Sequence, residues 1–315
     1  MTIQREDLGS QAGEAVSAFT ITNCHGLTAR IFSYGAILAE MHVPDRDGRF
    51  ADVTLGLPDI ASYVASRLYM GTICGRYANR IRAGRFHWRG ETVQLTQNEG
   101  QNHLHGGTCG LSFRNWTPRA EEGGDAVTLT CLSPAGEEGY PGNLQIELRY
   151  HLSADNEFVL DMQAHTDAAN VINLAHHGYW NMAGHASGPV DGQILTIAAE
   201  RYTPVDHELL PTGELAPVAQ TRFDMRGQRP LGAVLGTQGL DINYWLDGTG
   251  GDLHRAATLY DPVSGRMLEI TTDPPGLQVY SGEAIGPGLA AKSGAVYGPR
   301  AGIALEAQKF PDGPN

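Results

Sequence analysis

Residues 144–152 read LQIELRYHL and alternate strictly between apolar and polar side chains. Successive side chains of a β-strand point to opposite faces of a sheet, so this alternation predicts a strand with one buried face and one exposed face. The apolar positions that share the buried face are Leu144, Ile146, Leu148, Tyr150 and Leu152. We therefore expect a sheet that packs one face against a core.

Further strands are predicted on both sides of this one. The same alternation occurs in residues 125–132 and 156–166. Residues 36–57 indicate two strands around the turn PDRDG, and residues 86–95 indicate a hairpin that turns near Arg89 and Gly90, because Pro and Gly supply turn dihedrals. Each run is short and ends at a turn signal, as is typical of antiparallel sheets.

Helical periodicity is scarce in this chain. The best candidate is residues 59–70, where apolar side chains recur at helical spacing behind Asp59 as an N-terminal cap. Many short strands with few helices predict an all-β protein, an antiparallel β-sandwich or barrel. Because there is no internal repeat or linker-like tract, we expect residues 1–315 to form a single domain.

Composition restricts the classes of partner. The chain has 315 residues, 41% of them hydrophobic, and a formal net charge of −13. Such an acidic protein repels phosphate backbones and anionic lipid surfaces, which argues against nucleic acid or a membrane as its partner. The N-terminus lacks the apolar segment of a secretory signal, and no apolar run approaches the ~20 residues of a membrane span. We expect a cytoplasmic protein.

The chain contains four cysteines, Cys24, Cys74, Cys109 and Cys131. None forms a CxxC pair, and four in a chain of this length do not make a disulfide scaffold. We expect buried free thiols in a reducing compartment.

Side chains of catalytic type gather beside glycines in several separate segments. Together they supply histidines, carboxylates, an arginine, amides and aromatic rings. Arginine and amides bond hydroxyl groups, and histidine and glutamate exchange protons, so this inventory suits a polyhydroxylated ligand on which protons move. The side chains are Asn79, Arg80, His103, His105, His176, His177, Tyr179, Trp180, Asn181, Asp241, Gln278, Glu283 and Glu306.

At these residues the chain resembles the aldose 1-epimerases, or galactose mutarotases. Six segments match the motifs of that family and occur in the family's order. They are GRYANRI (75–81), NHLHGG (102–107), NLAHHGYWNMAG (173–184), GLDINY (239–244), PGLQVYSGE (275–283) and LEAQKFPDGPN (305–315).

The resemblance implies a fold and a set of residue roles. Members of the family are large antiparallel β-sandwiches with few short helices and a concave face that binds sugar. The family's general base corresponds to Glu306 and its general acid to His177, while His105 is a further catalytic contact to the ring oxygen or a hydroxyl. The family's sugar-binding positions correspond to Asn79, Arg80, Tyr179, Asp241 and Gln278.

The implied reaction interconverts the α and β anomers of a free aldose such as galactose or glucose. Glu306 removes the proton of the C1 hydroxyl while His177 protonates the ring oxygen, and the ring recloses after rotation about C1–C2. An unperturbed histidine pKa of ~6.5 suits the acid. The reaction changes no oxidation state, so we expect no cofactor and no metal. The expected partner is a small aldose, and the expected state is a monomer or homodimer.

The chain departs from the family pattern at several positions beside the proposed pair. The differing residues are His176, Gly178, Ile242 and Glu283. They bear on sugar preference more than on the type of reaction. Family members also continue for about one more strand pair, so the chain is expected to lack the last C-terminal strands of the family.

Three other interpretations remain. A metal-dependent enzyme would use His103 and His105, which a strand would place on one face, together with His176 or His177. A non-catalytic sugar sensor would share the scaffold and bind sugar without turning it over. A hexose-phosphate epimerase would need more basic residues than Arg76 and Arg80.

Overall fold

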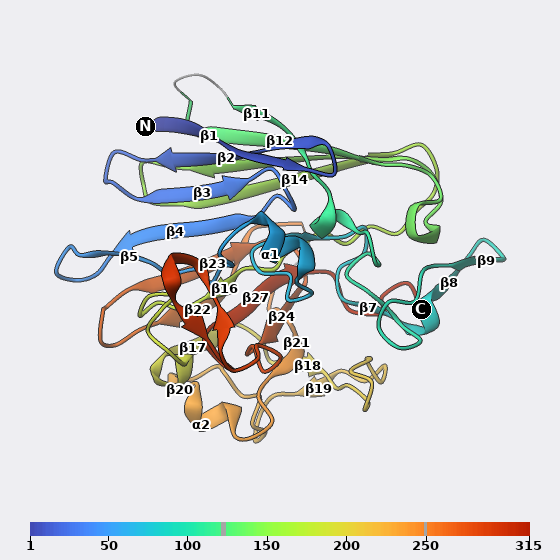
Figure 1. Cartoon of the computed structure of the whole chain (residues 1–315). Coiled ribbons are helices and arrows are strands. Elements are labelled where there is room, and N and C mark those ends of the chain that lie inside the picture. The colour runs from blue at the N-terminus through green and yellow to red at the C-terminus, as the bar shows by residue number, and fades with distance from the viewer. Residues whose placement is uncertain (121–123, 249–250) are drawn as a thin grey trace. The chain divides into compact units, whose positions relative to one another are not determined.

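The computed structural model describes residues 1–120, 124–248 and 251–315, and it is built mainly of short strands (Figure 1). The chain divides into two compact units. The first comprises Met1–His42, Asp59–Leu174 and Pro314–Asn315, and the second comprises Val43–Pro58 and Ala175–Gly313. The predicted all-β class is confirmed.

Two antiparallel sheets make up most of the first unit (Figure 1). In one of them, neighbouring strands follow chain order: β1 (Thr2–Gln11), β2 (Glu14–Thr22), β3 (Thr28–Phe32) and β4 (Leu38–Pro44), which continues into the second unit. The other has the order β11 (Thr117–Ala120), β12 (Ala126–Ser133), β13 (Leu144–Leu152) and β14 (Phe158–Thr166).

Strand β13 confirms the prediction for residues 144–152, since all five of its apolar side chains are buried. The next strand, β14, lies at the edge of the sheet, and its apolar face is only half-buried. Tyr150 points from β13 into the core and donates a hydrogen bond from its hydroxyl to the carbonyl of Ala36 at 2.6 Å. Asn23, which follows β2, likewise donates to the carbonyl of Ser153 at 3.0 Å. These bonds join the two sheets as layers of a sandwich.

The remaining elements of the first unit are short. The hairpin predicted near Arg89 and Gly90 is confirmed. The predicted helix exists but covers only Ile60–Ala65, because Ser66 is extended (φ −81°, ψ 149°) and ends it. Asp59 caps it by accepting a hydrogen bond from the Ser62 amide at 2.8 Å. The elements are α1 (Ile60–Ala65), β6 (Ile73–Cys74), β7 (Arg80–Ile81), η1 (Arg82–Gly84), β8 (Arg85–Trp88), β9 (Glu91–Gln94), β10 (His103–Leu104), η2 (Leu111–Phe113) and η3 (Glu137–Gly139).

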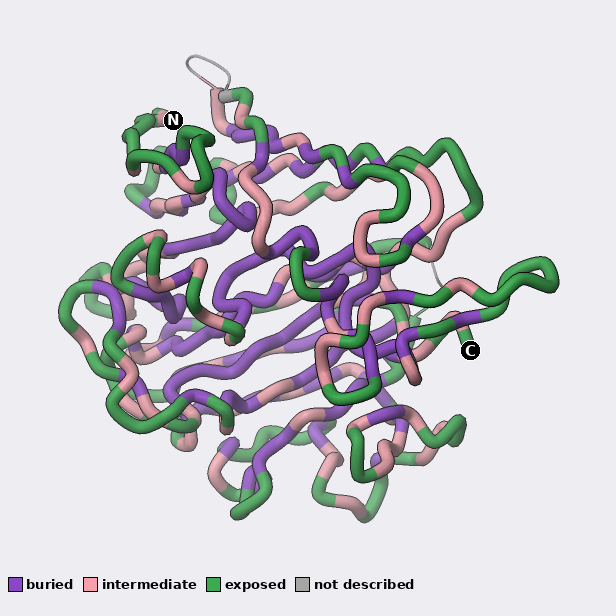
Figure 2. The backbone as a smooth tube through the Cα atoms, turned by 45° about the vertical axis from the view of Figure 1, so that its right-hand side comes forward, coloured by how far each residue is buried: buried purple, intermediate pink, exposed green. Residues whose placement is uncertain are grey.

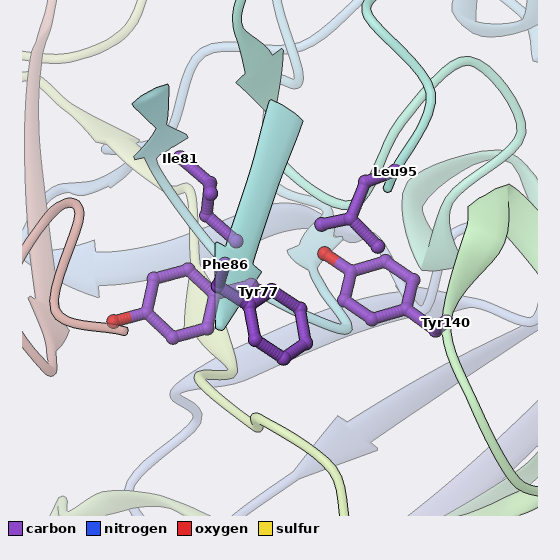
Figure 3. Packing of buried hydrophobic residues seen from close by; sticks show 5 residues of the cluster. All are labelled: Tyr77, Ile81, Phe86, Leu95 and Tyr140. Atoms are coloured by element: carbon purple, nitrogen blue, oxygen red, sulfur yellow. The ribbon is translucent and has the colours of Figure 1, made fainter. Parts of the chain in front are cut away.

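A cluster of five buried apolar side chains lies around β7 and β8. Figure 3 shows these side chains, Tyr77, Ile81, Phe86, Leu95 and Tyr140, gathered together. Ile81 is the residue after Arg80 in β7, so its burial fixes the position of the short strand that carries Arg80. Removing one such side chain from water stabilises the fold by about 1.5–3 kcal/mol.

The second unit is organised around a six-stranded sheet (Figure 1). Its strands, in spatial order, are β16 (Tyr179–Trp180), β27 (Ile303–Gln308), β24 (Gly276–Tyr280), β21 (Asp241–Trp245), β18 (Arg201–Thr203) and β19 (Ala216–Pro217). A four-stranded sheet has the order β20 (Arg229–Pro230), β17 (Ile194–Ile197), β22 (His254–Tyr260) and β23 (Met267–Thr272). The other elements are β5 (Phe50–Asp52), β15 (Ala175–His176), η4 (Val190–Gly192), α2 (Gly232–Leu235), β25 (Leu289–Ala290), η5 (Lys292–Gly294) and β26 (Val296–Tyr297).

A buried ion pair joins β5 to η5 within the second unit. The Lys292 ammonium lies 2.6 Å from a carboxylate oxygen of Asp52, and both side chains are less than a tenth exposed. Lys292 also donates to the hydroxyl of Thr54 at 3.3 Å. A buried charge of this kind depends on its partner, because an unpaired ammonium in the interior is strongly destabilising.

Figure 2 shows long buried stretches in the interior and exposed residues in the outer turns, although burial does not follow every strand, since β1 has no buried residue. The four cysteines are free thiols, as predicted, but only Cys74 and Cys131 are buried, whereas Cys24 and Cys109 are exposed. The prediction of buried thiols is therefore wrong for the latter two, which lie in turns. Each helix that the described residues form is too short or too polar to cross a lipid bilayer.

Candidate active site

Strand β27 has the sequence IALEAQ and carries the carboxylate of Glu306, and its two faces differ in polarity. Ile303 and Leu305 lie on a buried apolar face, while Ala304, Glu306 and Gln308 lie on the opposite face. Glu306 is nevertheless only 1% exposed. A buried carboxylate is costly unless polar neighbours compensate it, so the residues around Glu306 decide its role.

The register of the six-stranded sheet places a row of polar side chains beside Glu306. Gln278 of β24 is directly opposite Glu306, and Asn243 of β21 is directly opposite Gln278. Thr203 of β18 extends the row by one more strand. Residues on the same face of neighbouring strands have Cβ atoms about 5 Å apart, so these side chains form a continuous polar face.

Asp241 lies two residues before Asn243 and on the same face. It accepts a hydrogen bond from the Gln278 side-chain nitrogen at 2.5 Å. This contact fixes the amide of Gln278, since the nitrogen faces Asp241 and the oxygen is left to accept from elsewhere. The structure therefore brings together three residues that the sequence predicted as site residues: Glu306, Gln278 and Asp241.

His177 lies between β15 and β16, and β16 pairs directly with β27. Its Nε2 atom is 3.5 Å from Oε1 of Glu306, and the two side chains are 5% and 2% exposed. The predicted acid and base are thus neighbours. Tyr179 pairs with Ala304 across the same strands, and its ring packs against that of His177 with centroids 5.1 Å apart.

The environment of His177 changes its acidity. Burial, with a smaller contribution from the neighbouring His176, lowers the pKa of His177 to about 3. The expectation of an ordinary histidine pKa is therefore wrong for the substrate-free protein. The ring is neutral at pH 7, because burial penalises the charged imidazolium more than local hydrogen bonding favours it.

The other predicted site residues lie in the first unit, on and beside the paired strands β7 and β10. Asn79 and His105 bind each other through two hydrogen bonds: the amide of His105 donates to the Asn79 carbonyl at 3.1 Å, and the amide of Asn79 donates to Nδ1 of His105 at 3.2 Å. Because Nδ1 accepts, a neutral His105 carries its proton on Nε2 and can donate from that atom. Both residues have positive φ, 63° and 51°, a conformation that costs energy and recurs at functional sites.

Arg80 forms a two-point ion pair with Glu99, at 2.7 and 2.8 Å. Sequence reasoning missed Glu99, because nothing in its local pattern links it to an arginine 19 residues earlier. It also missed Tyr69, whose ring packs against His105 with centroids 4.7 Å apart.

His103 is a core residue. Nδ1 is 2.6 Å from the carbonyl of Thr96 and Nε2 is 2.7 Å from the hydroxyl of Tyr140, so both ring nitrogens already have protein partners. Burial lowers its pKa. These contacts argue against the metal-dependent interpretation, which needs His103 as a ligand.

Two of the departures from the family pattern have simple structural roles. Ile242 is 3% exposed and lies on the apolar face of β21. Glu283 accepts hydrogen bonds from Ser281 and forms an ion pair with Arg300 at 3.4 Å. Neither residue belongs to the polar face around Glu306.

A carboxylate and an imidazole in contact, with amides along the same sheet face, define an acid/base enzyme for a small polar substrate. The family model for aldose 1-epimerase matches residues 17–315 of this chain. The human galactose mutarotase is 40% identical over 292 residues, which cover 92% of this chain and 84% of that protein. The aldose 1-epimerase of Escherichia coli is 31% identical over 310 residues, 96% of this chain and 89% of that protein.

A solved structure agrees with these relatives. The galactose 1-epimerase of Lactobacillus acidophilus superposes with a TM-score of 0.86 at 29% identity, covering 100% of this chain and 92% of that one. The chain belongs to the aldose 1-epimerase family. The predicted family, its mutarotase-like fold and its class of enzyme, an isomerase that acts on carbohydrates, are confirmed.

Proposed function

We propose that this protein interconverts the α and β anomers of a free aldose, with Glu306 as general base and His177 as general acid. The observation that carries the proposal is the buried contact between the two side chains, 3.5 Å apart on the polar face of the sheet. The names of the relatives, galactose mutarotase and aldose 1-epimerase, support an aldose as substrate and make galactose the first sugar to test.

The proposed reaction balances its protons within this pair. Glu306 takes the proton of the C1 hydroxyl, the bond between C1 and the ring oxygen breaks, and the ring oxygen takes a proton from His177. The free aldehyde rotates about C1–C2, and the reverse transfers close the ring on the other face. Glu306 and His177 thereby return to their starting states.

The low pKa of His177 sets a condition on this scheme. A neutral imidazole is a poor acid, so His177 takes up its proton in the sugar complex. The negative charge of Glu306 beside Nε2 favours the imidazolium there. One proton shared by a carboxylate and an imidazole then serves the reaction in both directions.

Sugar binding is assigned first to residues of the second unit. Asp241 and Gln278 supply a carboxylate and an amide oxygen for hydroxyl groups, held by their mutual hydrogen bond. Tyr179 lies beside His177. Asn79, Arg80 and His105 keep their predicted roles as sugar contacts, with the ring nitrogen Nε2 of His105 as a donor.

The proposed partner is a small aldose alone. We propose a cytoplasmic monomer or homodimer, and the net charge of −13 supports a partner that is neither nucleic acid nor an anionic membrane.

Polarimetry of freshly dissolved, anomerically pure aldoses tests the proposal. We expect mutarotation well above the spontaneous rate for at least one sugar of a panel that includes galactose, glucose, arabinose and xylose. Sugar binding in calorimetric titration without faster mutarotation would instead identify a non-catalytic sugar sensor. Activity only on phosphorylated sugars would also overturn the proposal.

A further inference from the structure

Three amide side chains on the polar face of the six-stranded sheet are almost completely buried. Asn243, Gln278 and Gln308 are 1%, 4% and 0% exposed. Among residues 1–120, 124–248 and 251–315, both side-chain polar atoms of Asn243 and of Gln308, and the side-chain oxygen of Gln278, have no hydrogen-bond partner.

Unpaired buried amides destabilise a fold, and native proteins contain few of them. An apolar side chain of similar size would be the more stable choice at such a position. Residues that break this rule together, at one place, indicate a site where function outweighs stability.

These amides surround Glu306 in a regular way. Asn243 lies directly opposite Gln278, and Gln278 lies directly opposite Glu306, with neighbouring strands about 4.8 Å apart. Gln308 follows Glu306 by two residues, about 6.8 Å along the same strand face. Glu306 thus has an amide two residues along its own strand and another directly across from it.

Gly276 makes room for this arrangement. It lies between Trp245 and Gln308 in the register. A Cβ atom at this position would lie 2.8 Å from the side-chain oxygen of Asn243 and 3.1 Å from the backbone oxygen of Gln308. Any larger residue would displace the Asn243 amide, since a contact under 3.0 Å forces something to shift.

We propose that Asn243 and Gln308 are positioning residues for the acid/base reaction. Their amide dipoles keep the surroundings of Glu306 polar, so that this buried carboxylate stays charged and able to accept a proton, and they add no competing charge. Asn243 acts through Gln278, whose oxygen it keeps available to a sugar hydroxyl. Gln308 acts on Glu306 directly. This inference rests on the proposed aldose 1-epimerase function.

The test replaces each amide with an apolar side chain of similar size, as Asn243→Leu and Gln308→Leu. We expect kcat/KM for mutarotation to fall by about tenfold in each variant, which corresponds to one lost polar contact. Gln308→Leu should act mainly on kcat and Asn243→Leu mainly on KM. Tm should equal or exceed that of the wild type, because the unpaired amide atoms are removed.

Thr258→Val is the matched control. Thr258 lies in β22 of the four-stranded sheet, and its hydroxyl is likewise buried without a partner among the described residues. We expect this variant to hold or raise Tm and to leave kcat and KM unchanged. If kcat or KM changes in the two amide variants but not in Thr258→Val, the change is due to the place of the amides near Glu306. It is then not a general effect of replacing an unpaired buried polar group.

Two more variants guard against misfolding. Gln308→Met keeps an unbranched side chain at the same place, and Gly276→Ala displaces the Asn243 amide without removing it. Wild-type kcat and KM in Asn243→Leu and Gln308→Leu, or a lower Tm in either of them or in Gln308→Met, would overturn the proposal. Absence of mutarotation in the wild type would instead overturn the proposed function, so the two failures are distinguishable.

Discussion

Replacing Glu306 with glutamine tests the proposed base while keeping the shape of the side chain. Glu306 is 1% exposed, and its neighbour His177 is neutral at pH 7 because burial lowers the pKa of that ring to about 3. The substitution therefore breaks no ion pair with His177 in the substrate-free protein. It replaces a buried carboxyl group with an uncharged amide of the same shape, so we expect the free energy of unfolding to stay the same or to rise.

The catalytic effect should be large. A positioned general base contributes about 10²–10⁴-fold to a rate, or about 2.7–5.4 kcal/mol of activation free energy. We expect kcat of Glu306→Gln to fall by this factor. Adding His177→Asn should cost little more, because the two side chains act as one proton-transfer unit and their effects are not additive.

The assay is polarimetry of one pure anomer at pH 7, with Tm measured on the same preparations. Glu269→Gln is the matched control: Glu269 lies in β23 of the other sheet, and its side chain is 47% exposed. This variant should turn over sugar at the wild-type rate. An unchanged rate in Glu306→Gln, or a loss of activity that is matched by a loss of Tm, would refute the reasoning.

Three further predictions concern pH, the buried ion pair and the sugar contacts. Below pH ~6.5 the unfolded chain binds a proton at His177 that the folded protein does not bind, so the free energy of unfolding should fall by up to about 1.4 kcal/mol per pH unit from pH 6.5 toward 3. Urea unfolding should show a weaker dependence of this free energy on pH for His177→Gln, and the same dependence in both proteins would contradict the assigned pKa. Asp52→Asn should cost about 3–5 kcal/mol because it leaves the Lys292 ammonium unpaired, and a Tm equal to that of the wild type would show that the pair does not stabilise this unit. Arg80→Met should raise KM about tenfold or more, since charged hydrogen bonds are stronger than neutral ones, whereas an unchanged KM in the polarimetric assay would remove Arg80 from the sugar site.

Local patterns in the sequence were enough to predict several of the strands. Strand β13 follows directly from alternation within nine residues, and the hairpin at Gly90 follows from its turn chemistry. The helix at residues 60–65 is shorter than its periodicity predicted, because the extended backbone at Ser66 ends it. Periodicity reports which face of an element is apolar, but not where competing backbone contacts end it.

The proposed acid and base could be found in the sequence only through the family motifs. Their contact joins positions 177 and 306, and pairing between β16 and β27 creates it. The same limit explains why Asn243 and Glu99 were missed. Cross-strand register and ion pairs depend on partners far away in the chain, and a single sequence carries no local signal for them.

The sequence also did not predict the hydrogen-bond partners or the pKa of individual histidines. His103 and His105 are two residues apart, yet the first is held by a carbonyl and a tyrosine hydroxyl while the second binds Asn79. Burial, which a sequence does not display, also gives His177 a pKa far from that of a free side chain. Environment rather than residue type therefore decides which histidine can move a proton.

The strict alternation within β24 and β27 limits how this sheet can evolve. Deleting or inserting one residue inside β27 would turn Glu306 toward the apolar layer and bring Leu305 to the reactive side. Changes in length are harmless only in the connecting loops. The alternation within β27 therefore fixes the face of the sheet on which the proposed base lies.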